Sequence, residues 1–123
     1  MKTKALELAR DLSERSTIKI KVGAVIYTKN KILSWGWNNP GDGYGDHAEH
    51  MAVRRFIRAY RNVSSIPAYI AVFSTRKGKS ITSRPCGNCE KLLRSVGVRG
   101  ADYFRKEELD GKFVRYLVSE EYV

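Results

Sequence analysis

The most constraining feature of the sequence is an almost entirely apolar run at residues 68–74. A strand that is apolar at nearly every position has to be covered on both faces, which is typical of a sheet lying between two layers of helices. Two further runs rich in β-branched and aromatic residues, 22–27 and 32–37, are separated by a turn-like segment at 29–31 and predict a hairpin. Together these runs favour an α/β fold.

Helical periodicity appears in three other segments. The first, near the N-terminus, repeats apolar residues at helical spacing at Ala5, Leu8, Ala9 and Leu12. Residues 47–61 give a second helical pattern with an apolar stripe that includes Ala52 and Phe56. Residues 86–96 predict a short third helix, and Gly97 is placed to terminate it.

The last two predicted strands, 101–104 and 113–118, are joined by residues 105–112. A parallel pair needs a crossover of about a dozen residues or more, so we expect these two strands to be antiparallel. Residues 75–84 are polar and basic and predict a loop. No repeat or low-complexity linker divides the chain, so we expect residues 1–123 to form one α/β domain, a five-stranded mixed sheet with helices packed on it.

The chain is strongly basic, with 23 Lys and Arg against 13 Asp and Glu and a formal net charge of +10. This charge favours a phosphorylated or polyanionic partner, although a solvated basic surface would give the same value. The longest apolar run, residues 68–73, is too short to cross a membrane, and residues 1–10 lack the apolar stretch of a secretory signal. We therefore expect a cytoplasmic protein with no membrane partner.

Two clusters of reactive side chains begin predicted helices: His47-Ala48-Glu49 and Pro85-Cys86-Gly87-Asn88-Cys89. Two thiolates three residues apart lie on one side of a helix's first turn, where free N–H groups favour the ionised form. A histidine from a second helix start can complete a three-ligand zinc site with an open fourth position, the arrangement of a catalytic centre. Zinc lowers the pKa of bound water, and Glu49 can move its proton without ligating the metal.

Two other interpretations of these clusters stay open. His50 lies three residues after His47, so His47, His50, Cys86 and Cys89 could form a closed structural zinc site. That arrangement leaves Glu49 without a role. The two cysteines alone could also form a redox motif, although the sequence around them is polar and basic and lacks a thioredoxin-like opening.

The two clusters together resemble the H-x-E…P-C-x-x-C signature of the zinc-dependent cytidine and deoxycytidylate deaminase superfamily. The resemblance covers roughly residues 22–104 and includes Gly36-Trp37-Asn38. It implies a cytidine deaminase-like three-layer fold with helices on both faces of the sheet. It also implies that His47, Cys86 and Cys89 bind Zn²⁺, that Glu49 shuttles protons, and that three positions contact the substrate: Asn38 the sugar, and the backbone around Ala48 and Arg84 the base.

The resemblance leaves the substrate open. The 36–38 and 47–52 stretches look like tRNA adenosine deaminases, whereas an antiparallel final strand pair is similar to the cytidine deaminase branch and to some nucleic-acid-editing domains. The first hypothesis is hydrolytic deamination of a free cytosine nucleoside or nucleotide, by a chain whose copies can associate into a homo-oligomer. The second is deamination of cytosine or adenine in single-stranded nucleic acid, supported by the net charge, by a basic cluster and by three aromatic candidates. These residues are Arg76, Lys77, Lys79 and Arg84, with Trp35, Trp37 and Tyr44. The third is a non-catalytic zinc-stabilised binding module, which again leaves Glu49 without a role.

Overall fold

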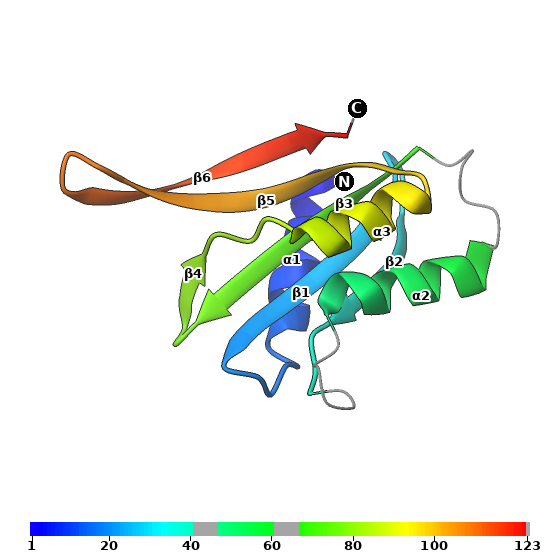
Figure 1. Ribbon diagram of the computed structural model, residues 1–123, viewed down its shortest axis with the longest axis horizontal. Helices are drawn as coiled ribbons and strands as arrows, with labels where there is room; N and C mark the ends of the chain where they lie inside the picture. The colour runs from blue at the N-terminus through cyan, green and yellow to red at the C-terminus, as the bar shows by residue number, and fades with distance from the viewer. Residues whose placement is uncertain (41–46, 61–66, 123) are drawn as a thin grey trace.

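A mixed β-sheet forms the centre of the protein, for which the computed structural model describes residues 1–40, 47–60 and 67–122 (Figure 1). Its strands are ordered β2-β1-β3-β5-β6, and the short β4 pairs with β3 outside this path. The helices and strands in chain order are α1 (Lys2–Ser13), β1 (Ile20–Tyr27), β2 (Ile32–Trp37), α2 (Ala48–Tyr60), β3 (Ala68–Arg76), β4 (Lys79–Ile81), α3 (Gly87–Ser95), β5 (Val98–Leu109) and β6 (Lys112–Glu121).

The central strand β3 is buried on both faces, as its apolar run predicts. Ile70 and Val72 face a core formed with α2 and α3, whereas Ala71 and Phe73 face a core formed with α1. The three-layer arrangement is visible in Figure 1, where α1 lies behind the sheet and α2 and α3 lie in front of it. The predicted α/β fold with helices on both faces is confirmed. Among the helices of the described residues, none is long and apolar enough to span a membrane.

The sheet has six strands, so the prediction of five is wrong by one short strand. Residues 75–84 were expected to form a loop, but Thr75 and Arg76 continue β3 and Lys79–Ile81 returns beside it as β4. Lys77 and Gly78 make the tight turn between them, with φ values of 52° and 77°. Hairpin turns of two residues favour such positive φ angles, because the backbone twist then matches that of the strands. The polar side chains of this segment concealed the strand.

The two C-terminal strands are antiparallel, as predicted, but they are much longer than predicted. Residues 105–112 were expected to be a connecting segment, and instead most of them extend β5 to Leu109. The turn consists of Asp110 and Gly111, which both have positive φ angles. A run of consecutive charged residues, which looks like a loop in the sequence, is compatible with a ribbon that faces solvent on both sides. The turn end of this hairpin extends past the helices (Figure 1).

Candidate metal centre and active site

The structure brings His47, Cys86 and Cys89 together from two helix starts. His47 precedes the first residue of α2, Cys86 is the N-cap of α3, and Cys89 lies in the first turn of α3. The Sγ atoms of the two cysteines are 3.3 Å apart, and Cys89 Sγ is 3.4 Å from His47 Nδ1. One nitrogen and two sulfur donors within 4.8 Å of one another match the donor set and size of a zinc site.

Gly36 on β2 allows α2 to begin where His47 can reach the cysteines. A Cβ atom at this position would lie 2.5 Å from the Ala48 carbonyl oxygen and 2.8 Å from the Ala52 nitrogen. Such contacts are well inside van der Waals distance, so only glycine lets the strand and the first turn of the helix approach this closely. The close approach fixes the position of Ala48, and with it the neighbouring His47 and Glu49.

Glu49 is buried next to the cysteines, with 6% of its surface exposed. Burial raises the pKa of the Cys89 thiol, and the nearby Glu49 carboxylate raises that pKa further. Two groups that become anions are therefore held close together with little solvent. A divalent cation at the three donors would reverse this effect and favour the thiolate, so the residues present fit zinc.

His50 does not belong to the three-donor group. Its ring stacks on that of His47, with 5.2 Å between the ring centroids. Among the described residues, the group of close metal-binding atoms contains His47, Cys86 and Cys89 without His50. The geometry therefore favours a three-ligand site with an open position over a closed site with four protein ligands.

A pocket of about 360 Å³ opens beside the three donors and contains His47, Glu49 and Cys86 in its wall. This volume is in the range of sites for small molecules of nucleoside size. The three residues predicted to contact substrate, Asn38, Ala48 and Arg84, also line it. The remaining wall residues are Ile18, Val22, Val72, Ser74, Thr82 and Ser83.

The Asn38 side chain is held in place by the backbone of β1. Its Oδ1 accepts a hydrogen bond of 2.8 Å from the Val22 N–H, and its Nδ2 donates one of 2.7 Å to the Ile20 carbonyl. Both contacts depend on the register between β1 and the end of β2, which sequence reasoning could not supply. The side chain is therefore pre-positioned at the pocket wall, and it also closes the end of the β1–β2 pair.

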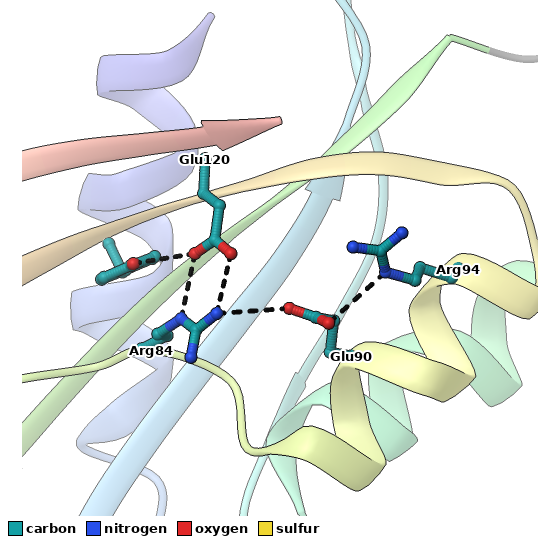
Figure 2. Close-up of polar contacts among 5 residues, drawn as sticks. Arg84, Glu90, Arg94 and Glu120 are labelled. Atoms are coloured by element: carbon teal, nitrogen blue, oxygen red, sulfur yellow. Dashed lines mark hydrogen bonds and ion pairs between the residues drawn. The ribbon is translucent and has the colours of Figure 1, made fainter. Parts of the chain in front are cut away.

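The Arg84 guanidinium points to β6 and α3. It donates two hydrogen bonds to the Glu120 carboxylate, at 3.0 and 2.8 Å, and its Nη2 lies 3.5 Å from Glu90 (Figure 2). Tyr103 donates a further hydrogen bond of 2.9 Å to Glu120. The Arg84 guanidinium is the main reason why the pKa of Glu120 falls to about 2 from its ordinary value. The Arg84 guanidinium is therefore engaged by Glu120 and Glu90 in the structure.

We predict that the Arg84–Glu120 pair stabilises the fold above about pH 4.5 and is lost in acid. The pKa of Glu120 is lowered in the folded chain, so its contribution is complete above the unfolded-state pKa and disappears as the pH falls toward about 2. Both side chains are partly exposed, so we expect a coupling energy of about 1 kcal/mol. A double-mutant cycle of Arg84→Gln and Glu120→Gln in urea, at about pH 6 and pH 3, measures it. A coupling energy that grows on acidification would contradict the prediction.

Several wall residues were missed by sequence reasoning. Ser83 Oγ accepts from the Ser74 N–H at 2.9 Å and donates to the Ile81 carbonyl at 2.9 Å, so it joins β3 to the segment that leads into Cys86. Thr82 Oγ1 accepts from the Lys106 N–H at 3.1 Å. Their position just before Arg84-Pro85-Cys86 was the available signal. Ile18, which lies between α1 and β1, carried no signal in the sequence.

The fold and the site define a class: a three-layer α/β domain with an open His-Cys-Cys candidate metal site beside a buried glutamate. The family model described as "Cytidine and deoxycytidylate deaminase zinc-binding region" matches residues 1–104. The chain belongs to this family. No curated protein matches the chain.

Three solved structures with the same fold are each 22% identical to the chain or less. The dCMP deaminase from the cyanophage S-TIM5 in apo form is 22% identical, covers 89% of this chain and 85% of its own, and has a TM-score of 0.64. The same cyanophage enzyme in complex with dCMP and dUMP is 22% identical over 81% of this chain and 77% of its own, with a TM-score of 0.63. A cytidine deaminase from Burkholderia pseudomallei is 20% identical over 93% of this chain and 90% of its own, with a TM-score of 0.66.

Proposed function

We propose that residues 1–123 act as one catalytic domain that hydrolytically deaminates the cytosine base of a free nucleoside or nucleotide. The observation that carries the proposal is the buried Glu49 carboxylate beside the His47, Cys86 and Cys89 donors, in the wall of a pocket of about 360 Å³. A purely structural zinc site gives no reason for burying a carboxylate at this place. The pocket supplies the space that a base and its sugar need.

Zinc bound by His47, Cys86 and Cys89 would lower the pKa of a coordinated water and so supply a nucleophile at neutral pH. Glu49 takes the proton from the attacking water and transfers it to the ring nitrogen next to the reacting carbon. The water oxygen forms the new carbon–oxygen bond at C4, and the bond from C4 to the amino group breaks. Glu49 delivers the second proton to the departing amino group, so that cytosine and water become uracil and ammonia.

The pocket walls suggest how the substrate is oriented. Asn38 contacts the sugar hydroxyl, and the backbone at Ala48 and Arg84 contacts the polar edge of the base. Asn38 and Arg84 are already fixed by β1 and by Glu120, so little ordering is needed when substrate binds. The structure of the cyanophage deaminase with dCMP and dUMP shows a protein of the same fold with a pyrimidine nucleotide, which supports this substrate class.

The surroundings of the two tryptophans, Trp35 and Trp37, favour a free substrate over single-stranded nucleic acid. Trp35 is 43% exposed, whereas Trp37 packs partly against the α1 core. The Arg55 guanidinium lies 5.8 Å from the Trp35 ring centroid and 5.1 Å from that of Trp37, and Arg15 lies 5.1 Å from Trp37. Arginines therefore occupy faces that bases would need for stacking. Tyr44 lies outside the described residues.

The proposal is tested by measuring ammonia release from cytidine, deoxycytidine, their monophosphates and a single-stranded oligonucleotide, side by side with zinc-loaded protein. We expect turnover of at least one free nucleoside or nucleotide at a kcat/KM at least about a hundredfold above that for the oligonucleotide. Turnover of the oligonucleotide alone would favour the nucleic-acid deaminase. Zinc binding with no turnover of any of these substrates would favour a non-catalytic module.

The salt dependence of KM separates the same alternatives. A nucleoside or monophosphate engages at most one phosphate, so we expect log KM to change little with log salt concentration. A bound single strand gives a slope of about 0.7 in magnitude for each phosphate contacted. Under the polymer hypothesis, Arg76→Ala, Lys77→Asn and Lys79→Ala together would flatten the slope, with Asn chosen because residue 77 has a φ of 52°. Neutralising Lys4, Lys29 and Arg99 is the matched control. A steep slope that only the first triple variant removes would contradict the proposal.

A further inference from the structure

The hairpin of β5 and β6 forms an arm at residues 105–117 that extends past the helices (Figure 1). Within the part of the chain that the structure describes, β6 pairs only with β5, so its other edge is open along Lys112–Glu121. An open edge of this length presents unpaired N–H and C=O groups that can accept another strand.

Large apolar side chains are exposed on both faces of the arm. Because side chains alternate along a strand, Phe113 and Leu117 lie on one face of β6, and Val114 and Tyr116 lie on the other. The exposed set is Leu109, Phe113, Val114, Tyr116 and Leu117, and Phe113 is 69% exposed. A two-stranded ribbon is marginally stable by itself, and apolar groups on both faces are best covered when the sheet continues into a further strand.

The charge of the arm region argues against a polyanionic partner. Residues 105–121, which are the arm together with the rest of β6, contain four Lys or Arg and five Asp or Glu, a formal net charge of −1, although the whole chain carries +10. Three of the five exposed side chains, Leu109, Val114 and Leu117, are aliphatic and do not stack on bases. A protein strand of balanced charge suits this edge better than nucleic acid does.

We propose that the partner is a second copy of this chain, whose β6 pairs antiparallel with the first about a two-fold axis at Leu117. The charges along β6 are ordered for self-pairing, with Lys112 and Arg115 in its first half and Glu120 and Glu121 in its second. A two-fold axis perpendicular to the sheet reverses the second strand and makes the two contacting surfaces identical. The result is one continuous sheet through both copies.

The two-fold axis at Leu117 brings both pairs of opposite charges together. Arg115 of one copy becomes a diagonal neighbour of Glu121 of the other on one face, and Lys112 becomes a diagonal neighbour of Glu120 on the opposite face. Leu117 of one copy packs against Leu117 of the other, and Tyr116 of one copy lies opposite Val118 of the other. Arg115 and Glu121 are the better pair to test, because Glu120 already binds Arg84.

A charge exchange between Arg115 and Glu121 tests the interface by sedimentation velocity. We expect the wild-type chain to dimerise with a Kd on the order of 1–100 µM. Arg115→Glu and Glu121→Lys each place like charges together twice per dimer, so each variant alone should bind itself at least about tenfold more weakly. An equimolar mixture of the two variants restores opposite charges and should recover the wild-type Kd.

Lys4→Glu on α1 changes the net charge as much as Arg115→Glu does and is the control, which should dimerise like wild type. Recovery in the mixture also shows that both variants are folded. A wild-type chain that stays monomeric up to about 200 µM would overturn the proposal. So would variants that dimerise as wild type does, or a mixture that stays monomeric.

Discussion

Glu49→Gln is expected to abolish turnover while the protein keeps its fold and its zinc. The amide has nearly the same shape as the carboxylate and can hydrogen-bond water, but it cannot accept the proton of water or pass it on. General acid–base catalysis contributes about 10²–10⁴-fold, and a single side chain serves several proton transfers in this reaction, so we expect a loss at the upper end or beyond. Steady-state ammonia release with zinc-loaded protein measures the effect.

Glu7→Gln is the matched control for this variant, because Glu7 is an exposed α1 residue and that helix covers the opposite face of the sheet. It should retain wild-type activity. Zinc content by elemental analysis and the thermal transition should be unchanged in both variants. A Glu49→Gln protein that retains more than about a tenth of the wild-type rate would remove Glu49 from the proton-transfer role.

Cys89→Ala is expected to lose zinc, and with it most of the stability that zinc supplies. A ligand that binds only the folded chain stabilises it by about 4 kcal/mol when its free concentration is a thousandfold above Kd. Removing one of three protein donors lowers the affinity, because thiolates hold zinc more strongly than water does. Thermal unfolding with and without zinc, together with elemental analysis, measures both effects.

Cys86→Ala provides the comparison within the same site. Cys86 is exposed, whereas Cys89 is 0% exposed. Both variants should lose zinc-dependent stabilisation, but in zinc-free buffer only Cys89→Ala should also leave a buried cavity and cost about 1 kcal/mol. A full equivalent of tightly bound zinc in either variant would show that the substituted cysteine is not a ligand.

The layers of the fold could be predicted because their signals are local. The run that became β3 is apolar on both faces, and α2 has a clear apolar stripe, so burial on two sides follows from side-chain type alone. The lengths of β5 and β6 could not be predicted in this way. Arg105, Lys106, Glu107 and Glu108 are consecutive charged residues, and only the pairing of β5 with β6 makes them a strand. Lys79–Ile81 was missed for the same reason.

The core of the candidate site could be predicted from two short motifs. The combination of a histidine, a glutamate and two cysteines at the spacing of His47, Glu49, Cys86 and Cys89 is uncommon. The contacts around them could not be predicted. Arg84 and Glu120 lie 36 positions apart, and their ion pair depends on how β6 is placed against the segment before α3. Asn38 depends likewise on the β1–β2 register. Such contacts are set by tertiary structure and leave no pattern in the sequence.

The most direct test of the central claim is mass spectrometry of the pyrimidine formed when zinc-loaded protein acts on cytidine or dCMP in ¹⁸O-labelled water. Hydrolytic deamination at C4 predicts a uracil product that carries one heavy oxygen, formed together with one equivalent of ammonia. The same incubation with Glu49→Gln should yield neither. A wild-type product without the heavy oxygen, or no product from any free cytosine nucleoside or nucleotide, would contradict the account.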